Sequence, residues 1–267
     1  MISTTDLLAA YDSQLRLDAE MIGARTWHHH GPLVRGVFSD AGFVSYRDLG
    51  GLTGDEVDRL IAETVAWFRD ETDVASFEWK TRGHDRPADL PDRLVAHGVR
   101  PDPPETVMIG RAELLDQPVA LPEGIAVRRA GERGDLRGDI ERAVRMQADV
   151  FGRSAGPDVA ELVDKLTATP DLGGLWLAED ADGVVVCAGR LEVVPGTEFA
   201  GLWGGATRAP WRGHGIYRAL VAARARAALD LGVVYLHSDC TAMSRPILER
   251  SGLTAVTTTT PYTWTRG

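Results

Sequence analysis

The chain has few cysteines and no long apolar run, and each shortage excludes a class of protein. Cys187 and Cys240 are the only cysteines, and neither lies in a CxxC or His-flanked pattern, which argues against a disulfide-stapled secreted domain and a structural zinc site. No stretch approaches the ~18 apolar residues of a membrane span, and residues 1–10 lack the pattern of a signal peptide. We therefore predict a cytoplasmic protein with two reduced, partly buried thiols and no metal.

Positive charge is also scarce. The 267 residues hold 29 Lys+Arg against 39 Asp+Glu, and residues 1–121 carry a net charge of −9 while the remainder carries −1. Nucleic acids and anionic membranes require a concentrated basic face, so we expect neither as a partner. The acidic first part would instead attract a cation if it faced a binding cleft.

Length and composition predict two domains, at roughly 150 residues each. The run from Asp116 to Gly124 contains two prolines and a glycine without periodicity, so we place a linker at 116–123 between domains 1–115 and 124–267. Hydrophobic patterns in the first domain predict helices and strands in the order α-β-β-α-β-α-β. These are a helix at 5–19, a strand hairpin at 33–38 and 42–46, a helix that starts in a Thr53–Glu56 capping box and runs to Phe68, a strand at 77–80, a helix at 90–97 and a strand at 106–110.

The second domain has no repeated βαβ unit of regular length, so a doubly wound Rossmann sheet is not expected. Its patterns predict a strand at 125–129, helices at 135–151 and 157–167, strands at 174–178, 184–194 and 199–207, a helix at 216–231, a strand at 233–237, a helix at 244–251 and a hairpin-like stretch at 253–264.

The segment that carries chemistry is the glycine-containing loop between the strand at 199–207 and the helix at 216–231. Free N–H groups and the helix dipole make such a helix start an anion site, and Gly213 and Gly215 let a phosphate approach the backbone. Arg212 and Arg218 add positive charge. A plain glycine-rich turn that caps a packing helix is the alternative. The loop does not match the P-loop pattern, which excludes a P-loop NTPase. It also lacks the third glycine of the dinucleotide fingerprint, which disfavours a nicotinamide or flavin cofactor.

The run from Arg212 to Ile216 resembles motif A, [Q/R]-x-x-G-x-[G/A], of the GNAT acetyltransferase superfamily. Ser244 to Leu253 resembles motif B, and the element order β-α-α-β-β-β-α-β-α-β-β also resembles that family. The likeness covers 124–264 and implies an α/β fold (α+β in some schemes) with a GNAT-like mixed central sheet flanked by helices. Domain 1–115, with its strand, helix and strand after residue 77, resembles a smaller, degenerate GNAT-like α+β domain without its own cofactor, and an unrelated packing domain is the alternative.

The resemblance implies acetyl-CoA (coenzyme A) as cofactor, with its pyrophosphate on the amides from Gly213 to Arg218 and its pantetheine along the preceding strand, in the splay between two parallel strands. The implied cofactor-binding residues are Ala206, Thr207, Arg208, Arg212, Gly213, His214, Gly215, Ile216, Tyr217, Arg218 and Ser244.

Three positions depart from the family. Thr241 stands where motif B often has asparagine. Tyr217 stands where motif A ends in Gly or Ala, and it would hinder the backbone unless its ring points away. Leu248 stands where the family often has a tyrosine that protonates the CoA thiolate. Tyr262, Ser244, Tyr235 or water could replace that donor, or the enzyme is weak or inactive.

A general base is needed because the acceptor amine must be neutral to attack. Glu198, which opens the strand before motif A, and Asp239, which ends the next strand, are the candidates, and a solvated strand residue and a helix cap are their alternatives. The predicted catalytic set is thus Glu198, Asp239 and Tyr262.

Histidines and one tryptophan are weaker candidates. His28, His29 and His30 are expected in a solvated loop without metal, because no partner stands at ligand spacing. We expect His237 and Trp203 to be packed strand residues, although either could border the acceptor pocket.

The resulting hypothesis is an N-acetyltransferase that transfers acetyl to a primary amine, in a small molecule or a peptide, by direct attack. A non-catalytic acyl-CoA-binding or sensing protein is the alternative. The sequence leaves open the acceptor's identity and the oligomeric state, a homodimer included.

Overall fold

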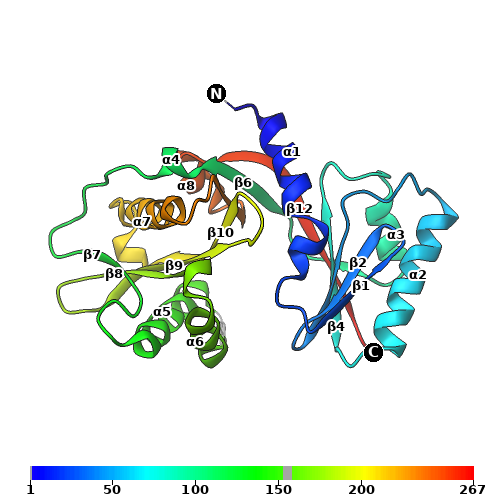
Figure 1. Cartoon of the computed structure of the whole chain (residues 1–267), viewed down its shortest axis with the longest axis horizontal. Coiled ribbons are helices and arrows are strands. Elements are labelled where there is room, and N and C mark those ends of the chain that lie inside the picture. Colours follow the sequence, from blue (N-terminus) through cyan, green and yellow to red (C-terminus); the bar gives the residue numbers. More distant parts are fainter. Residues whose placement is uncertain (1, 153–157) are drawn as a thin grey trace. The chain divides into compact units, whose positions relative to one another are not determined.

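The computed structural model describes residues 2–152 and 158–267, and its contacts divide the chain into two compact units (Figure 1). Unit 1 comprises Met1–Met108, Asp239–Arg245 and Ala255–Gly267, and unit 2 comprises Ile109–Ser238 and Pro246–Thr254. No helix of the described ranges is long and apolar enough to cross a membrane.

Unit 1 is built on a mixed sheet with the strand order β1-β2-β3-β4-β12. The first three strands are antiparallel neighbours, β3 and β4 are parallel, and β4 and β12 are antiparallel. The elements are α1 (Thr4–Gln14), the 3-10 helix η1 (Leu17–Met21), β1 (Thr26–His30), β2 (Leu33–Val37), β3 (Ala41–Ser45), α2 (Asp55–Asp70), β4 (Ser76–Arg82), α3 (Leu90–Ala96), β5 (Arg100–Pro101), which pairs with β12, and β12 (Thr254–Thr265).

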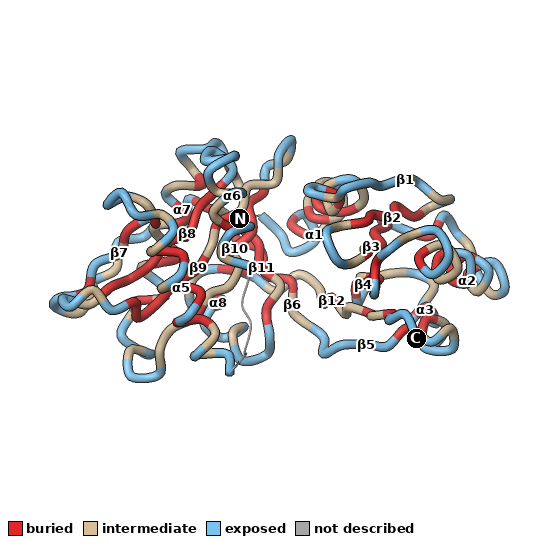
Figure 2. The backbone as a smooth tube through the Cα atoms, turned by 90° about the horizontal axis from the view of Figure 1, so that it is seen from below, coloured by how far each residue is buried: buried red, intermediate tan, exposed pale blue. Residues whose placement is uncertain are grey.

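Strand β4 divides the side chains of unit 1 between two environments. Phe77 and Trp79 are buried in the hydrophobic core that β4 shares with α2 and α3. Alternate residues of a strand point to opposite faces, so Glu78 and Lys80 lie on the other, polar face. In β4 intermediate and buried residues alternate, whereas the edge strand β1 is mostly exposed (Figure 2).

Unit 2 has the strand order β11-β10-β9-β8-β7, in which only β10 and β11 are parallel. Helices α5 and α6 pack on one face of this sheet and α7 on the other (Figure 1). The elements are α4 (Ala112–Leu115), β7 (Ala126–Arg129), α5 (Leu136–Phe151), α6 (Val159–Ala168), η2 (Pro170–Leu172), β8 (Gly173–Glu179), β9 (Val185–Val193), β10 (Phe199–Thr207), η3 (Ala209–Trp211), α7 (Ile216–Asp230) and α8 (Arg245–Arg250). Strands β6 (Glu105–Arg111) and β11 (Tyr235–Cys240) cross the boundary between the units along the chain.

The two units repeat one arrangement. In each, three antiparallel strands are followed by a helix and then by a strand parallel to the third: β1-β2-β3-α2-β4 and β8-β9-β10-α7-β11. The glycine-containing loop before α2 differs in charge from the one before α7, because the first turn of α2 contains Asp55, Glu56 and Asp58. These carboxylates would repel a pyrophosphate.

Several predicted elements need correction. Residues 28–30 form β1 instead of a loop, because an edge strand can be polar and carries no apolar alternation. The capping box at Thr53 is wrong: Gly54 is the N-cap of α2, and no side chain of the described residues caps it. The stretch at 253–264 is one strand instead of a hairpin. The predicted helix start at 157 lies outside the described residues.

The predicted domain division also differs from the compact units. β12 pairs with β4 over seven residue positions, from Thr259 opposite Arg82 to Thr265 opposite Ser76. The C-terminal strand therefore belongs to unit 1, whereas the linker at 116–123 would assign it to the second domain. A pairing between residues so far apart in sequence leaves no local pattern to detect.

Candidate cofactor site

Strands β10 and β11 separate along their length. Their parallel pairing runs only from Phe199 opposite Tyr235 to Gly201 opposite His237, whereas β10 continues to Thr207 beside β9. The hydroxyl of Ser238 donates to the carbonyl of Leu202 at 2.9 Å, just past the last pair. Beyond this point alternate backbone groups of β10 face the opening. The structure thus shows the splay that the resemblance implies.

A β-bulge lies within the open part of β10. The register shifts between Trp203 and Ala206, and Gly204 has a φ of +61°, a left-handed conformation that favours glycine. Gln147 of α5 donates its amide Nε2 to the carbonyl of Gly204 at 2.5 Å. An extra residue without local periodicity cannot be read from sequence, so sequence reasoning missed both the bulge and Gln147.

The loop that follows β10 presents free backbone amides. Gly213 and Gly215 have φ values of +81° and +78°, and Gly215 is the N-cap of α7. Within the described residues no side chain caps this helix, and its first turn contains no acidic residue. The N–H groups of Ile216, Tyr217 and Arg218 therefore point outward without intrahelical partners and favour an anion.

Arginines surround the end of β10. Arg212 donates Nε to the carbonyl of Thr207 at 3.0 Å, which holds the loop against the strand. Arg208 donates Nε to the carbonyl of Val185 at 3.0 Å, and its Nη2 lies 3.3 Å from Asp149. His214 and Arg218 are exposed. Apart from Ser244, the predicted cofactor-binding residues are gathered at this one end of β10.

The ring of Tyr217 packs on the sheet instead of covering the loop. A Cβ placed on Gly205 would lie 2.7 Å from Tyr217 Cε2 and 2.8 Å from its hydroxyl oxygen. The ring therefore lies against β10, on the sheet side of α7. This departure from motif A leaves the first-turn amides accessible.

The two predicted bases lie in different settings. Glu198 directly precedes β10, and its carbonyl accepts hydrogen bonds from the amides of Val234 and Tyr235, both at 2.9 Å. It stands three residues, or roughly 10 Å of strand, before the point where the splay opens. Its role as base stays a prediction.

Asp239 is engaged in an ion pair of unit 1. Lys80 Nζ lies 2.5 Å from Asp239 Oδ2, and the two side chains are 17% and 4% exposed. Burial alone would lower the pKa of Lys80, but the attraction of Asp239 outweighs it and holds this pKa above its usual value. The ion pair involves one of the two carboxylate oxygens of Asp239, and the role of Asp239 as base, like that of Glu198, stays a prediction.

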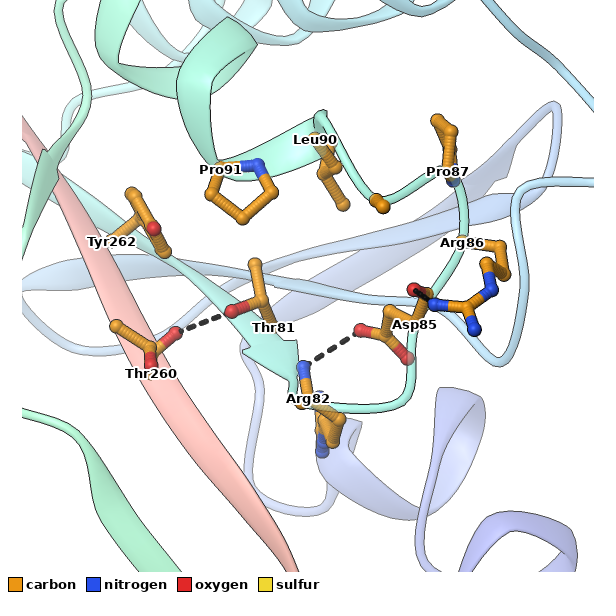
Figure 3. A pocket seen from close by; sticks show the side chains of 11 residues that line it. Thr81, Arg82, Asp85, Arg86, Pro87, Leu90, Pro91, Thr260 and Tyr262 are labelled. Atoms are coloured by element: carbon orange, nitrogen blue, oxygen red, sulfur yellow. Dashed lines mark hydrogen bonds between the residues drawn. The ribbon is translucent and has the colours of Figure 1, made fainter.

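Of the candidate proton donors, Tyr262 and Ser244 lie in unit 1. Tyr262 lines a cavity of about 170 Å³ together with residues of β4, of the following turn and of α3 (Figure 3). Burial raises the pKa of its hydroxyl. Ser244 donates its N–H to the carbonyl of Thr241 in a turn. Leu248, at the family's usual tyrosine position, is a buried residue of α8 with 2% exposure.

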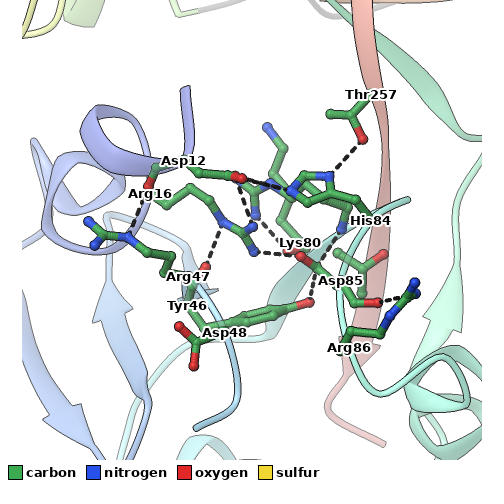
Figure 4. A network of polar contacts seen from close by, with 12 residues as sticks. Asp12, Arg16, Tyr46, Arg47, Asp48, Lys80, His84, Asp85, Arg86 and Thr257 are labelled. Atoms are coloured by element: carbon green, nitrogen blue, oxygen red, sulfur yellow. Dashed lines mark hydrogen bonds and ion pairs between the residues drawn. The ribbon is translucent and has the colours of Figure 1, made fainter. Parts of the chain in front are cut away.

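A charged network also lies within unit 1 (Figure 4). Arg16 pairs with Asp12 and Asp85, the hydroxyl of Tyr46 donates to Asp85 at 2.5 Å, and His84 contacts Asp12 at 2.9 Å. These contacts fasten α1 to the turn after β4. Sequence reasoning did not find this network, because its members come from three separate segments of the chain.

The weaker candidates are packed or paired. His28 contacts Arg35 at 2.9 Å, His30 contacts Glu63 at 2.9 Å, and the described residues contain no group of three metal ligands. His237 is buried against Trp203, their ring centroids 5.4 Å apart. Both cysteines are buried thiols that are not joined in a disulfide.

Comparisons with known proteins support the fold. No protein-family model and no curated protein matches the sequence. A solved GCN5-related N-acetyltransferase from Kribbella flavida superposes with a TM-score of 0.70 at 17% identity, over 100% of this chain and 97% of its own. A GCN5-related N-acetyltransferase from Sphaerobacter thermophilus gives 0.64 at 19% identity, over 88% and 76%. A tandem GNAT protein from the clavulanic acid biosynthesis pathway gives 0.61 at 15% identity, over 88% and 78%.

The chain has the two-domain GNAT fold. Within this fold, the splay of β10 and β11 and the loop before α7 form the candidate cofactor site. The GNAT fold also agrees with the element order that the sequence predicted for the second domain. At 15–19% sequence identity these superpositions support the fold and leave the reaction to be inferred from the residues of the site.

Proposed function

We propose that the chain is an acetyl-CoA-dependent N-acetyltransferase that transfers the acetyl group to a primary amine by direct attack. The observation that carries the proposal is the glycine loop at the start of α7, placed at the end of a strand that has separated from its parallel neighbour. Acetyl-CoA needs both features, an anion site for its pyrophosphate and an open strand edge for its pantetheine.

The residues present fit this cofactor. Gly213 has open space around it, Tyr217 lies on the sheet, and Arg212 and Arg218 bring positive charge without an acidic residue in the first turn. The amides from Gly213 to Arg218 would hold the phosphates, and the segment from Ala206 to Arg208 would hold the pantetheine. When bound, acetyl-CoA supplies an activated acetyl thioester.

The chain's own groups would then accept a proton from the acceptor amine, donate a proton to the leaving thiolate and stabilise the negative charge that develops on the carbonyl oxygen. Glu198, or a water that it holds, accepts the proton of the acceptor ammonium so that the nitrogen can attack. Backbone N–H groups on the open edge of β10 stabilise the charge that develops on the carbonyl oxygen. As the C–N bond forms and the C–S bond breaks, the nitrogen would give up its second proton to water, and Tyr262, Ser244, Tyr235 or water would donate the proton that the leaving thiolate requires.

Binding is tested with Gly215→Glu, which puts a carboxylate where the pyrophosphate should lie. Gly232→Glu, at the same φ of +78° beyond the other end of α7, is the control for the backbone strain and the added charge. Gly215→Gln is the control for steric contact, because a Cβ on Gly215 lies 3.3 Å from Val119 Cγ1 whereas Gly232 has open space around it, and it should weaken binding less than Gly215→Glu does. We expect Gly215→Glu to weaken coenzyme A binding at least tenfold in calorimetry and Gly232→Glu to leave it within twofold. Equal affinity for the two variants would contradict the placement of the cofactor.

A non-catalytic acyl-CoA sensor is the second candidate, favoured by the buried Leu248 at the usual position of the proton donor. The two functions separate when the protein is mixed with acetyl-CoA and a panel of primary amines and free thiol is followed. Thiol release with any amine supports the transferase. Tight binding of coenzyme A without thiol release on the whole panel supports the sensor.

A further inference from the structure

Arg224 of α7 is a fully buried cation without a carboxylate partner among residues 2–152 and 158–267. The residue is 0% exposed. Nε donates to the carbonyl of Leu220 at 3.2 Å, Nη1 donates to the carbonyl of Arg190 at 3.0 Å, and Nη2 is buried without a hydrogen-bond partner. Burying an unpaired charge is costly, so stability alone does not account for an arginine here.

The side chain folds back along α7 toward the start of the helix. The acceptor of Nε is one turn earlier, and the guanidinium carbon lies 5.9 Å from the ring centroid of Tyr217. Side chains of a helix point toward its N-terminus, so the charge of Arg224 lies beside the first two turns of α7. Those turns begin at the free amides of the cofactor site.

The sheet makes room for this arrangement. A Cβ on Gly189 of β9 would lie 2.8 Å from Nη1 of Arg224, and a Cβ on Gly205 of β10 would collide with Tyr217. Glycine at both positions lets α7 approach the sheet with a long side chain beneath it. The guanidinium thus occupies a defined place, bounded by Gly189 below and the Tyr217 ring at one side.

The rest of α7 does not cancel this charge. Arg226, two residues further on, is exposed and pairs with Asp116 at 2.6 Å. Arg224 has no such partner, and the first turn of the helix has no acidic residue. The positive potential of the helix start and that of Arg224 therefore add.

We propose that Arg224 is a buried binding charge for the phosphates of the cofactor, which acts on them through space from beneath the first turns of α7. The proposal rests on the proposed function, because it assumes a polyanion at the loop. A unit charge about 10 Å from an anion, at an effective dielectric constant of about 20, changes a binding constant by about tenfold. A buried charge is poorly screened, so this contribution should persist at high salt.

The test compares Arg224→Met with Arg226→Met, which removes the same charge from the same helix at an exposed position. Two probes are used in calorimetry: coenzyme A, and pantetheine, which lacks phosphates. We expect Arg224→Met to weaken coenzyme A binding about tenfold at both low and high salt and to leave pantetheine affinity within twofold. The melting temperature should not fall, because an apolar side chain of similar volume relieves the burial of the charge. Arg226→Met should change coenzyme A affinity less than twofold.

Other outcomes overturn the proposal in distinguishable ways. Unchanged coenzyme A affinity in Arg224→Met, or an equal loss for both probes, would show that the side chain only packs. If this variant does not fold, Arg224→Gln is measured instead, and failure of both to fold would show that the charge serves stability. If the unaltered protein does not bind coenzyme A, the proposed function fails first.

Discussion

At the scale of the residue, Arg128 organises the most concentrated buried charge in unit 2. Its guanidinium lies between Asp139 of α5, at 2.5 and 2.7 Å, and Glu179 of β8, at 2.6 and 2.9 Å. All three side chains are at most 6% exposed. Burial would raise the pKa of Asp139, but the bonds from Arg128 outweigh it and hold this pKa well below its usual range. The pKa of Glu179 is lowered in the same way.

Replacing Arg128 with methionine should remove the buried cation between the two carboxylates and leave them with Arg142, which contacts both at 2.5 and 2.7 Å but is 38% exposed. We expect Arg128→Met to lower the free energy of unfolding at pH 7 by about 3 kcal/mol, the lower end of the cost of breaking a buried ion pair, because Arg142 still compensates part of the charge. Urea unfolding measures this change. Arg137→Met on the exposed side of α5, where the ion pair to Glu141 is 4.0 Å long, should cost less than about 0.5 kcal/mol and serves as control.

The cluster of Arg128, Asp139 and Glu179 makes the stability of the fold depend on pH in the acid range. A carboxyl whose pKa is lowered by folding stabilises the fold above its unfolded pKa of about 4, and loses this effect as pH falls toward the folded value. Between pH 5 and pH 3 the unaltered protein should therefore lose stability. Arg128→Met should lose less stability over this range, because Asp139 and Glu179, then paired mainly with the half-exposed Arg142, are protonated at a lower cost. Parallel unfolding curves of the two proteins against pH would contradict this account.

Among the elements, helix α7 packs on strand β10 through the ring of Tyr217, and a methyl group added to Gly205 would disturb this contact. The ring of Tyr217 occupies the space above Gly205. The sequence indicated the helix and the strand correctly, because each has its own periodicity. Their contact could not be predicted, since nothing local to Gly205 records which side chain packs above it.

Gly205→Ala should push the Tyr217 ring and the first turn of α7 away from β10. We expect a loss of about 1–3 kcal/mol in stability and a weaker affinity for coenzyme A, measured by urea unfolding and calorimetry. The double variant Gly205→Ala/Tyr217→Leu gives the methyl group room and should recover most of both losses. If the double variant has the same stability and coenzyme A affinity as Gly205→Ala, the contact between Tyr217 and Gly205 is not the cause of the losses.

At the scale of the whole molecule, the C-terminal strand completes the N-terminal unit. Tyr262 and Trp264 of β12 belong to the core of unit 1, where the ring of Trp264 stacks on Phe77 at 5.4 Å. A domain cut at 116–123 removes this strand and leaves β4 with an unpaired edge and an open core. Folding of unit 1 therefore requires the chain to be complete to its last strand.

A fragment of residues 1–115 should consequently be unfolded. The same fragment with residues 255–267 appended through a flexible linker should fold, because the strand restores the ladder to β4 and the aromatic contacts. Circular dichroism and dispersed amide resonances measure the difference, and a fragment with a scrambled 255–267 segment is the control. A folded 1–115 fragment would show that the unit does not depend on β12.

The order of nearly all helices and strands, the GNAT resemblance and the position of the glycine-containing loop before α7 could be predicted from the sequence, because periodicity, helix starts and glycine-containing turns are local properties. The tertiary structure was needed to show which strand completes unit 1, where Tyr217 points, that Asp239 pairs with Lys80, and that Arg224 is buried without a carboxylate partner among the described residues. Each of these depends on which distant residues meet, and the free energy of a buried charge or a packed ring is set by those neighbours instead of by the residue's own segment.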